Sequence, residues 1–327
     1  MTESSHNAND STLLAIVHGD IDREMQGQLH HLAPTGESVV LPPLYLFERL
    51  FERRDRYQKH LQISCPPVIL QNTERHVRES ETVLREAVGD TVFSQIHECR
   101  RMVFLINSLG GKMVSGKTLG RLARMVQLNS GKVEGYIGNY AHSTAADILA
   151  DMDVRVALPE SKLMWHRRSF KNDDATAEEI AEDIASIDEF FEKNVRHHQE
   201  LVRERLRLAF EDPLNKDKEV SFTGSEMEKF GVVQTVKTID DLEATVTAAL
   251  PAIPLATETL QESIARFFRF NRAEKSVRET YGKDIYLHTE TPKITCEYYE
   301  GISPEKNREI LSFLAEKLRK PSEPTHE

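Results

Sequence analysis

Short, continuous apolar runs that end at a glycine or a proline dominate the first half of the chain. The clearest run is Met102–Ile106, and a similar run occupies residues 13–17. Residues 133–137 and 154–158 are also mostly apolar, with one charged residue each. Runs of four to six apolar residues bounded by turn residues are typical of strands that are buried on both faces. We therefore expect four buried strands here, each ending at the glycine, proline or glycine-rich loop that follows it.

Segments with helical spacing alternate with these strands. Residues 119–128 and 143–152 lie between them, and this alternation in a short span predicts a layered α/β core with right-handed connections. The charged segments 46–60 and 73–100 are also predicted to be helical. Farther along, residues 175–210 carry apolar residues at steps of three and four opposite a charged face. This pattern predicts a long helix that packs on another helix or on another subunit.

The two ends of the chain differ from its middle. Residues 1–11 are polar and predict a disordered tail. Residues 250–327 begin with two prolines and are expected to form a separate C-terminal extension. Its pattern predicts a helix over 258–270, a strand near 285–287 and a final helix over 304–318.

Composition indicates a soluble globular protein of 327 residues, with 39% hydrophobic and 29% charged residues. A net charge of −11 and a pI near 5.7 argue against a general nucleic-acid-binding surface, which is usually basic. No apolar run approaches the roughly 18 residues of a membrane helix, and the polar start predicts no secretory signal. The three widely spaced cysteines indicate reduced thiols and a cytoplasmic protein.

Three segments carry candidate chemistry. In residues 107–111, Asn-Ser-Leu-Gly-Gly, two adjacent glycines allow backbone N–H groups to approach a ligand and to form an oxyanion hole. In residues 138–146, Ser143 lies between a strand and an alanine-rich helix, where free N–H groups are available. Residues 157–166 end at His166, a base that could take the proton of a serine at neutral pH.

In this order, the three segments resemble the Clp protease proteolytic subunit of the Clp/crotonase superfamily. The family pattern is a strand, Asn-Ser-Pro-Gly-Gly, a nucleophilic Ser before a small-residue helix, and then Leu-Pro-Asn-Ser-(basic)-x-Met-x-His. Residues 16–22 and 222–233 also resemble the family's first strand and a late element. The resemblance implies that residues 12–249 form a Clp/crotonase-like layered α/β domain. This domain would include a long handle-type helix. The resemblance also implies that residues 33–95 are an insertion.

The resemblance implies a serine peptidase that needs no metal or organic cofactor. Ser143 would be the nucleophile and His166 the general base, and the backbone of Gly110 or Gly111 with that of Thr144 would form the oxyanion hole. An ungapped count places Asn215 at the third triad position, where the family has Asp. Asp212 would take that position if the alignment in this loop shifted by a few residues, and it is the other candidate.

The family likeness also implies partners. The substrate would be a peptide or an unfolded protein, and the chain would form a homo-oligomeric ring with the 175–210 helix at the subunit contacts. An ATP-dependent unfoldase is a possible partner, and neither nucleic acid nor membrane is expected as one.

Several residues depart from the family pattern. Leu109 replaces the loop proline, Thr144 replaces a methionine, and the bulky His142 precedes the nucleophile. Together with Asn215, these departures leave open a catalytically inactive member that acts as a scaffold or assembly subunit.

Each chemical interpretation has a structural alternative. Ser143 could be an ordinary helix N-cap, and His166 could be a core histidine. The His30–His31 and His197–His198 pairs lack the partners of a zinc motif, and we expect both pairs to face solvent. His142 is expected to be a surface or packing residue rather than a second base.

A second functional alternative comes from residues 111–118, which match the P-loop pattern G-x-x-x-x-G-K-[ST] after a predicted strand and before a predicted helix. In that case backbone N–H groups would surround a phosphate, Lys117 would contact the β/γ oxygens and Thr118 would bind magnesium. No apolar strand ending in Asp follows that could serve as the second magnesium site, so peptidase is the preferred interpretation.

Overall fold

The protein is described by a computed structural model that covers residues 11–22, 28–35, 37–63, 65–166, 219–250, 258–282, 285–290, 293–298 and 303–318. The predicted handle-type helix over 175–210 and the His197–His198 pair lie outside these residues. The predicted disordered tail, residues 1–11, also lies outside them except for its last residue. None of the helices in the described part is long and apolar enough to cross a membrane.

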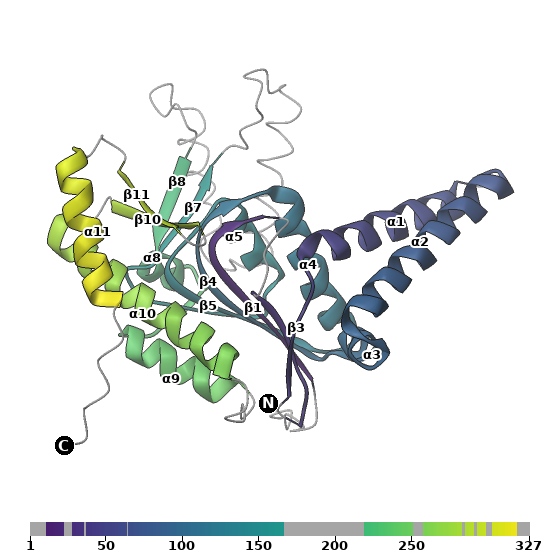
Figure 1. The fold of residues 1–327 in the computed structure, drawn as a ribbon, viewed down its shortest axis with the longest axis horizontal. Helices are drawn as coiled ribbons and strands as arrows, with labels where there is room; N and C mark the ends of the chain where they lie inside the picture. Colours follow the sequence, from purple (N-terminus) through teal and green to yellow (C-terminus); the bar gives the residue numbers. More distant parts are fainter. Residues whose placement is uncertain are drawn as a thin grey trace.

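A nine-stranded mixed sheet forms the centre of the described part (Figure 1). Four parallel strands run next to one another in the order β1, β4, β5, β6, with β9 beside β6 and the β2–β3 hairpin antiparallel beside β1. Strand β5 is long enough to pair with β6 along its first half and with β7 along its second, and β8 is antiparallel to β7. The bounds are β1 Thr12–Ile21, β2 Leu29–Leu32, β3 Ser38–Val40, β4 Arg101–Gly111, β5 Lys132–His142, β6 Val154–Ala157, β7 Lys162–His166, β8 Glu219–Thr223 and β9 Gln234–Thr235.

Both faces of this sheet are buried, which explains the continuous apolar runs of its central strands. One face packs on α4 (Met113–Leu128) and on the inner ends of the helices that precede β4. The other face packs on α9 (Ile239–Ala249) and α10 (Glu258–Tyr281). Side chains of one strand alternate between the two clusters: Leu13, Ala15 and Val17 belong to the first, and Leu14 and Ile16 to the second. The mixed α/β architecture predicted from the sequence is confirmed.

Two strands continue beyond their predicted ends. The Asn-Ser-Leu-Gly-Gly segment was expected to be a loop, but it forms the last five residues of β4. Gly138 was expected to end the next strand, yet β5 runs on to His142. The neighbouring strands explain both extensions, because β1 pairs with β4 as far as Gly111 and β7 pairs with β5 as far as His142.

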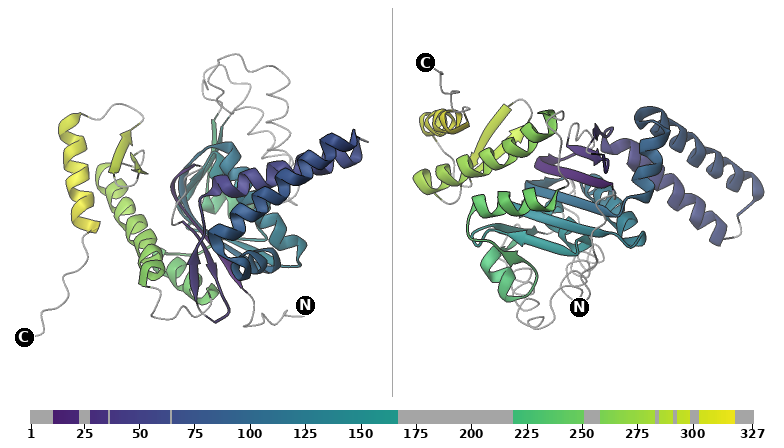
Figure 2. Two further views of the ribbon diagram at one scale, coloured as in Figure 1. Left: turned by 45° about the vertical axis from the view of Figure 1, so that its right-hand side comes forward. Right: turned by 90° about the horizontal axis from the view of Figure 1, so that it is seen from below.

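The segment expected to be an insertion contains a helical hairpin that projects from the body (Figures 1 and 2). It consists of α1 (Leu44–Gln62) and α2 (Pro67–Val88), and a short α3 (Asp90–Glu98) leads into β4. Pro67 begins α2, at a position where its missing N–H costs nothing, and Gly89 with a φ of 83° separates α2 from α3.

The C-terminal extension is not separate from the core. Helix α10 is longer than predicted, and Leu260, Phe267 and Phe268 are buried in the same cluster as side chains of β1 and β4. A smaller cluster joins its second half to β10 (Ile285–Glu290) and α11 (Pro304–Leu318). Strand β10 pairs with β11 (Lys293–Tyr298), which the sequence pattern did not predict.

The buried position of the first histidine pair corrects one expectation. His30 and His31 lie in β2, between β1 and β3, and only 2% and 1% of their surfaces are exposed. They were expected to face solvent, but both are buried within the sheet.

Candidate active site

Ser143 and His166 come together at the ends of two neighbouring strands. Strand β5 ends at His142 and β7 ends at His166, and the two strands are paired side by side in parallel. The Ser143 hydroxyl oxygen lies 2.8 Å from His166 Nε2, which is hydrogen-bond distance. The Ser143 N–H also donates to the Met164 carbonyl, at 2.8 Å. The turn that carries the serine is therefore attached to the strand that carries the histidine.

The backbone of Ser143 adopts a rare conformation. Its φ of 52° and ψ of −126° lie in a region that side chains other than glycine seldom occupy. The residue precedes α5 (Thr144–Asp147), but its side chain makes no capping hydrogen bond to that helix. This geometry differs from that of an ordinary N-cap and leaves the hydroxyl at the His166 ring. A strained turn between a strand and a helix is a known way to expose a nucleophile.

The two glycines at the end of β4 lie against this turn. A Cβ atom on Gly110 would be 2.7 Å from the Cβ of Ser143 and 2.8 Å from the His142 carbonyl oxygen, so only a glycine fits there. A Cβ on Gly111 would lie 2.3 Å from the Ile21 carbonyl oxygen. Both glycines also have positive φ, 107° and 142°. The close approach of bare backbone to the serine is the feature that an oxyanion hole requires.

The hydrogen bonds at this end of β4 distinguish the proposed oxyanion donors. The N–H of Gly110 donates to the Ser108 hydroxyl at 3.0 Å, and that hydroxyl donates in turn to the Gly19 carbonyl. The Thr144 hydroxyl donates to the Gly111 carbonyl at 2.9 Å and joins the end of β4 to α5. The N–H of Thr144 is at the first position of α5, where helix geometry offers it no partner within the helix.

Next to the pair, His142 is packed inside the protein. Only 4% of its surface is exposed, and its ring lies 5.4 Å from the ring of Tyr140. Burial and, after it, the nearby Lys162 and Arg278 cations lower the pKa of His142 to about 3. The ring is therefore neutral near pH 7 and is a packing residue.

A cavity of about 800 Å³ lies beside the same strands. Strands β5, β7 and β8, together with helices α8 (Gly224–Lys229) and α10, contribute to its walls. Because Lys162 begins the strand that ends at His166, the cavity shares β7 with the serine–histidine pair. Side chains of both charges line it, including Glu160, Lys162, Glu226, Lys275 and Arg278.

The third triad position lies outside the described residues, because Asn215 and Asp212 both belong to the segment 167–218. Their roles stay predictions.

The local structure contradicts the P-loop alternative. Helix α4 begins at Met113, so the residues that would have to wrap a phosphate as a loop form its first turns. Gly116 serves packing instead, because a Cβ there would lie 2.1 Å from Thr144 Cγ2. The Thr118 hydroxyl donates to the Val114 carbonyl at 3.0 Å within the helix.

A buried polar cluster behind the site was not anticipated from the sequence. Asn107 of β4, Asn139 of β5, and Asn271 and Glu274 of α10 are each exposed by 1% or less. Asn107 and Asn139 lie in the recognised motifs, but their partners on α10 are more than 130 residues away. Nothing in the spacing of the sequence connects them.

Comparison with known proteins identifies the family. The Clp protease family model matches residues 74–240, which is just over half of the chain. The chain belongs to the Clp protease family. This confirms the resemblance drawn from the motifs, and the match begins inside the segment that we expected to be an insertion.

Two further comparisons accompany this match. A solved structure of a ClpP1 mutant from Listeria monocytogenes is 14% identical, with a TM-score of 0.36, and the match covers 70% of this chain and 94% of that chain. No curated protein matches the chain.

Proposed function

We propose that this Clp protease family member is a serine peptidase. The observation that carries the proposal is the 2.8 Å contact between Ser143 Oγ and His166 Nε2. Ser143 lies in a strained turn next to two glycines. His166 would take the hydroxyl proton while Ser143 attacks a peptide carbonyl carbon, and it would return that proton to the leaving amine. A water molecule would then hydrolyse the acyl-enzyme by the same route.

Backbone N–H groups would stabilise the oxyanion that forms on the carbonyl oxygen. Thr144 is one candidate donor, and Gly110 or Gly111 is the other. The Gly110 N–H can serve only after the Ser108 hydroxyl releases it. Asn215 or Asp212 would orient His166. An Ala substitution at whichever of these two residues orients His166 should lower kcat by a factor of at least about 100. An Ala substitution at the second residue should not lower kcat in this way.

Labelling with a fluorophosphonate probe tests the reaction class. We expect the wild type to be labelled and Ser143→Ala and His166→Ala to remain unlabelled. Ser130→Gly is a matched control, because Ser130 is the other described non-glycine residue with positive φ and is exposed away from the pair. Labelling of the Ser143→Ala variant at the wild-type rate would overturn the proposal.

The bond between Gly110 and Ser108 also favours a second candidate, a catalytically inactive scaffold subunit. In that case the intact oligomer would neither react with the probe nor cleave unfolded protein substrates. The peptidase proposal includes a cytoplasmic homo-oligomeric ring and an ATP-dependent unfoldase partner. Sedimentation of the full chain would show whether the ring forms.

A further inference from the structure

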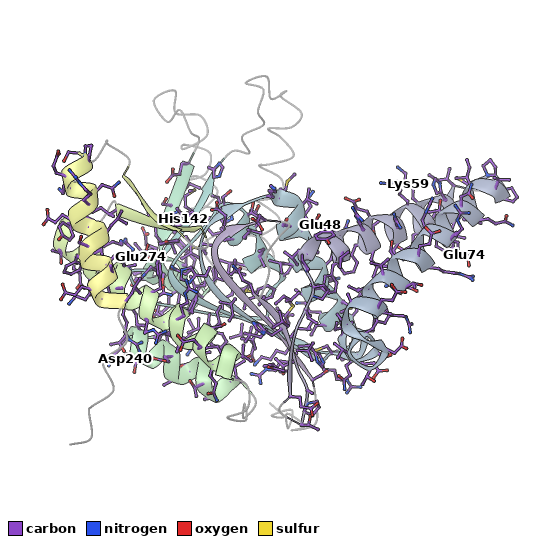
Figure 3. The ribbon with its side chains drawn as sticks, in the orientation of Figure 1. Glu48, Lys59, Glu74, His142, Asp240 and Glu274 are labelled. Atoms are coloured by element: carbon purple, nitrogen blue, oxygen red, sulfur yellow. The ribbon has the colours of Figure 1, made fainter. Side chains whose placement is uncertain are left out.

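Three donors from the strands of the proposed active site converge on one carboxylate of the C-terminal extension. Glu274 of α10 is fully buried, and its Oε2 accepts from Asn107 Nδ2 at 3.2 Å and from Asn139 Nδ2 at 2.9 Å. Tyr140 also donates a hydrogen bond to this carboxyl group. Figure 3 labels Glu274 in the body of the molecule, on the side away from the projecting hairpin.

Asn271, one turn before Glu274 on α10, makes the contact with β5 specific. Its Oδ1 accepts from the Asn139 N–H at 2.9 Å, and its backbone carbonyl accepts from Asn139 Nδ2 at 2.9 Å. A Cβ on Gly138 would lie 2.1 Å from Asn271 Oδ1. A side chain at residue 138 would therefore displace the Asn271 amide from this position.

The hydrogen bonds lie where the regular pairing of β4 and β5 breaks down. Ile106 pairs with Ile137 and Ser108 pairs with Ala141, so two steps along β4 correspond to four along β5. The Asn107 side chain covers this irregularity, since its Oδ1 accepts from the N–H groups of Asn139 and Tyr140 at 2.9 and 3.3 Å. It thereby replaces hydrogen bonds that a regular ladder would supply.

The direction of the Asn107 amide depends on Glu274. A side-chain amide has a donor end and an acceptor end, and only the acceptor end can bridge the two N–H groups of β5. A carboxylate beside the other end holds Nδ2 there and keeps Oδ1 on β5. Three residues after Asn107 the chain reaches Gly110, and four residues after Asn139 it reaches Ser143.

We propose that Glu274 is a positioning residue, which fixes the Asn107 amide and through it the distance between the Gly110 backbone and Ser143. This inference rests on the proposed peptidase function. It makes the C-terminal extension a part of the catalytic apparatus, acting through Asn107 of β4.

Other contacts also hold α10 against the sheet and α9. The positioning role of Glu274 can therefore be tested separately from the packing of α10. Phe267 and Phe268 are buried against the sheet, and Arg272 forms ion pairs with Asp240 and Glu243 of α9. Arg272→Ala removes one of these docking contacts and leaves the amide cluster intact. It is therefore the matched control for variants of Glu274.

The test compares Glu274→Ala, Glu274→Gln and Arg272→Ala in the full chain. Amide hydrogen exchange of residues 107–112 and 138–144 is measured together with the rate of fluorophosphonate labelling. Glu274→Ala should lower protection of both segments and slow labelling by at least tenfold. Glu274→Gln should restore most of both, because an amide oxygen can still accept from Asn107 and Asn139. Arg272→Ala should change neither quantity.

The inference would be overturned if the two segments of Glu274→Ala kept the amide protection of the wild type. It would also be overturned if Arg272→Ala lost as much protection as Glu274→Ala. If Glu274→Ala does not fold, Asn107→Ser removes the bridging amide while α10 keeps its other contacts, and it should give the same loss of protection. If the wild type itself is not labelled, the peptidase proposal fails, and the exchange measurement still decides whether Glu274 positions the two segments.

Discussion

The helical hairpin and the carboxyl ends of β4 and β5 are both rich in polar side chains, yet they use them in opposite ways. In α1 the buried residues end at Leu50, and in α2 they begin only at Ser80, so the outer part of the hairpin is exposed. Lys59 and Glu74, labelled in Figure 3, lie on this projecting part. At the strand ends, in contrast, the polar side chains are almost fully buried and bonded to one another.

The difference shows what polar groups contribute in each place. Exposed ion pairs on a helix contribute about 0.5 kcal/mol or less, because water solvates both partners well when they separate. A buried donor or acceptor that loses its partner costs about 1–3 kcal/mol. The hairpin can therefore tolerate changes in its charges, while the cluster behind the active site cannot.

The largest effect on stability should come from the base of the hairpin. Phe47 of α1 is 1% exposed and belongs to the main core cluster. Phe47→Ala should lower the free energy of unfolding by about 3–5 kcal/mol, because it leaves a cavity. Urea unfolding measures the change. Leu61→Ala near the tip, where Leu61 is 53% exposed, is the control and should stay within about 0.5 kcal/mol of wild type. Equal losses would show that the tip is buried in solution.

The next effect concerns activity. Gly110→Ala puts a methyl group within 2.7 Å of the Ser143 Cβ, at a residue whose φ is 107°. Because the end of β4 or the serine must move, the rate of probe labelling should fall by at least a factor of about 100, the usual cost of losing one oxyanion donor. Gly89→Ala also replaces a glycine of positive φ but has open space around it, and should leave labelling unchanged. Labelling of Gly110→Ala at the wild-type rate would show that the end of β4 takes no part in the reaction.

The buried His142 ring should make stability depend on pH. The unfolded chain takes up a proton on this ring below about pH 6.5, whereas the folded protein, with a pKa near 3, does not. Stability from this residue is therefore complete above pH 6.5 and falls by about 1.4 kcal/mol per pH unit down to about pH 3.

Unfolding of wild type and His142→Asn at pH 7 and pH 5 checks this dependence. The loss between the two pH values should be smaller in the variant by about 2 kcal/mol. His76→Asn, at an exposed position on α2, should lose as much as the wild type. An unchanged loss in His142→Asn would show that the ring is protonated in the folded state.

The smallest effect on stability is expected in the exposed part of the helical hairpin. Arg78 of α2 pairs with Glu74 one turn earlier, and Arg78 is 75% exposed. Arg78→Ala should change the free energy of unfolding by less than about 0.5 kcal/mol, and the change should shrink further in 0.5 M salt. If urea unfolding showed a loss of more than about 1 kcal/mol in the free energy of unfolding, the helical hairpin would be buried against another part of an assembly.

The sequence by itself determined the family, the α/β class and the candidate pair Ser143 and His166. These features depend on local patterns: apolar runs that fill a sheet buried on both faces, and glycines, serine and histidine at fixed short spacings. The same local reasoning could not find the ends of β4 and β5, because pairing with β1 and β7 extends them past their glycines. It also placed His30 and His31 in solvent, since a single strand does not show what covers it.

Only the tertiary structure decided how the site is held. The strained backbone of Ser143 and the close approach of Gly110 to Ser143 depend on atoms from separate strands meeting at one edge of the sheet. The link from Glu274 to Asn107 spans 167 residues of chain. Such a contact leaves no periodicity or spacing in the sequence, because it exists only when α10 folds back onto the sheet.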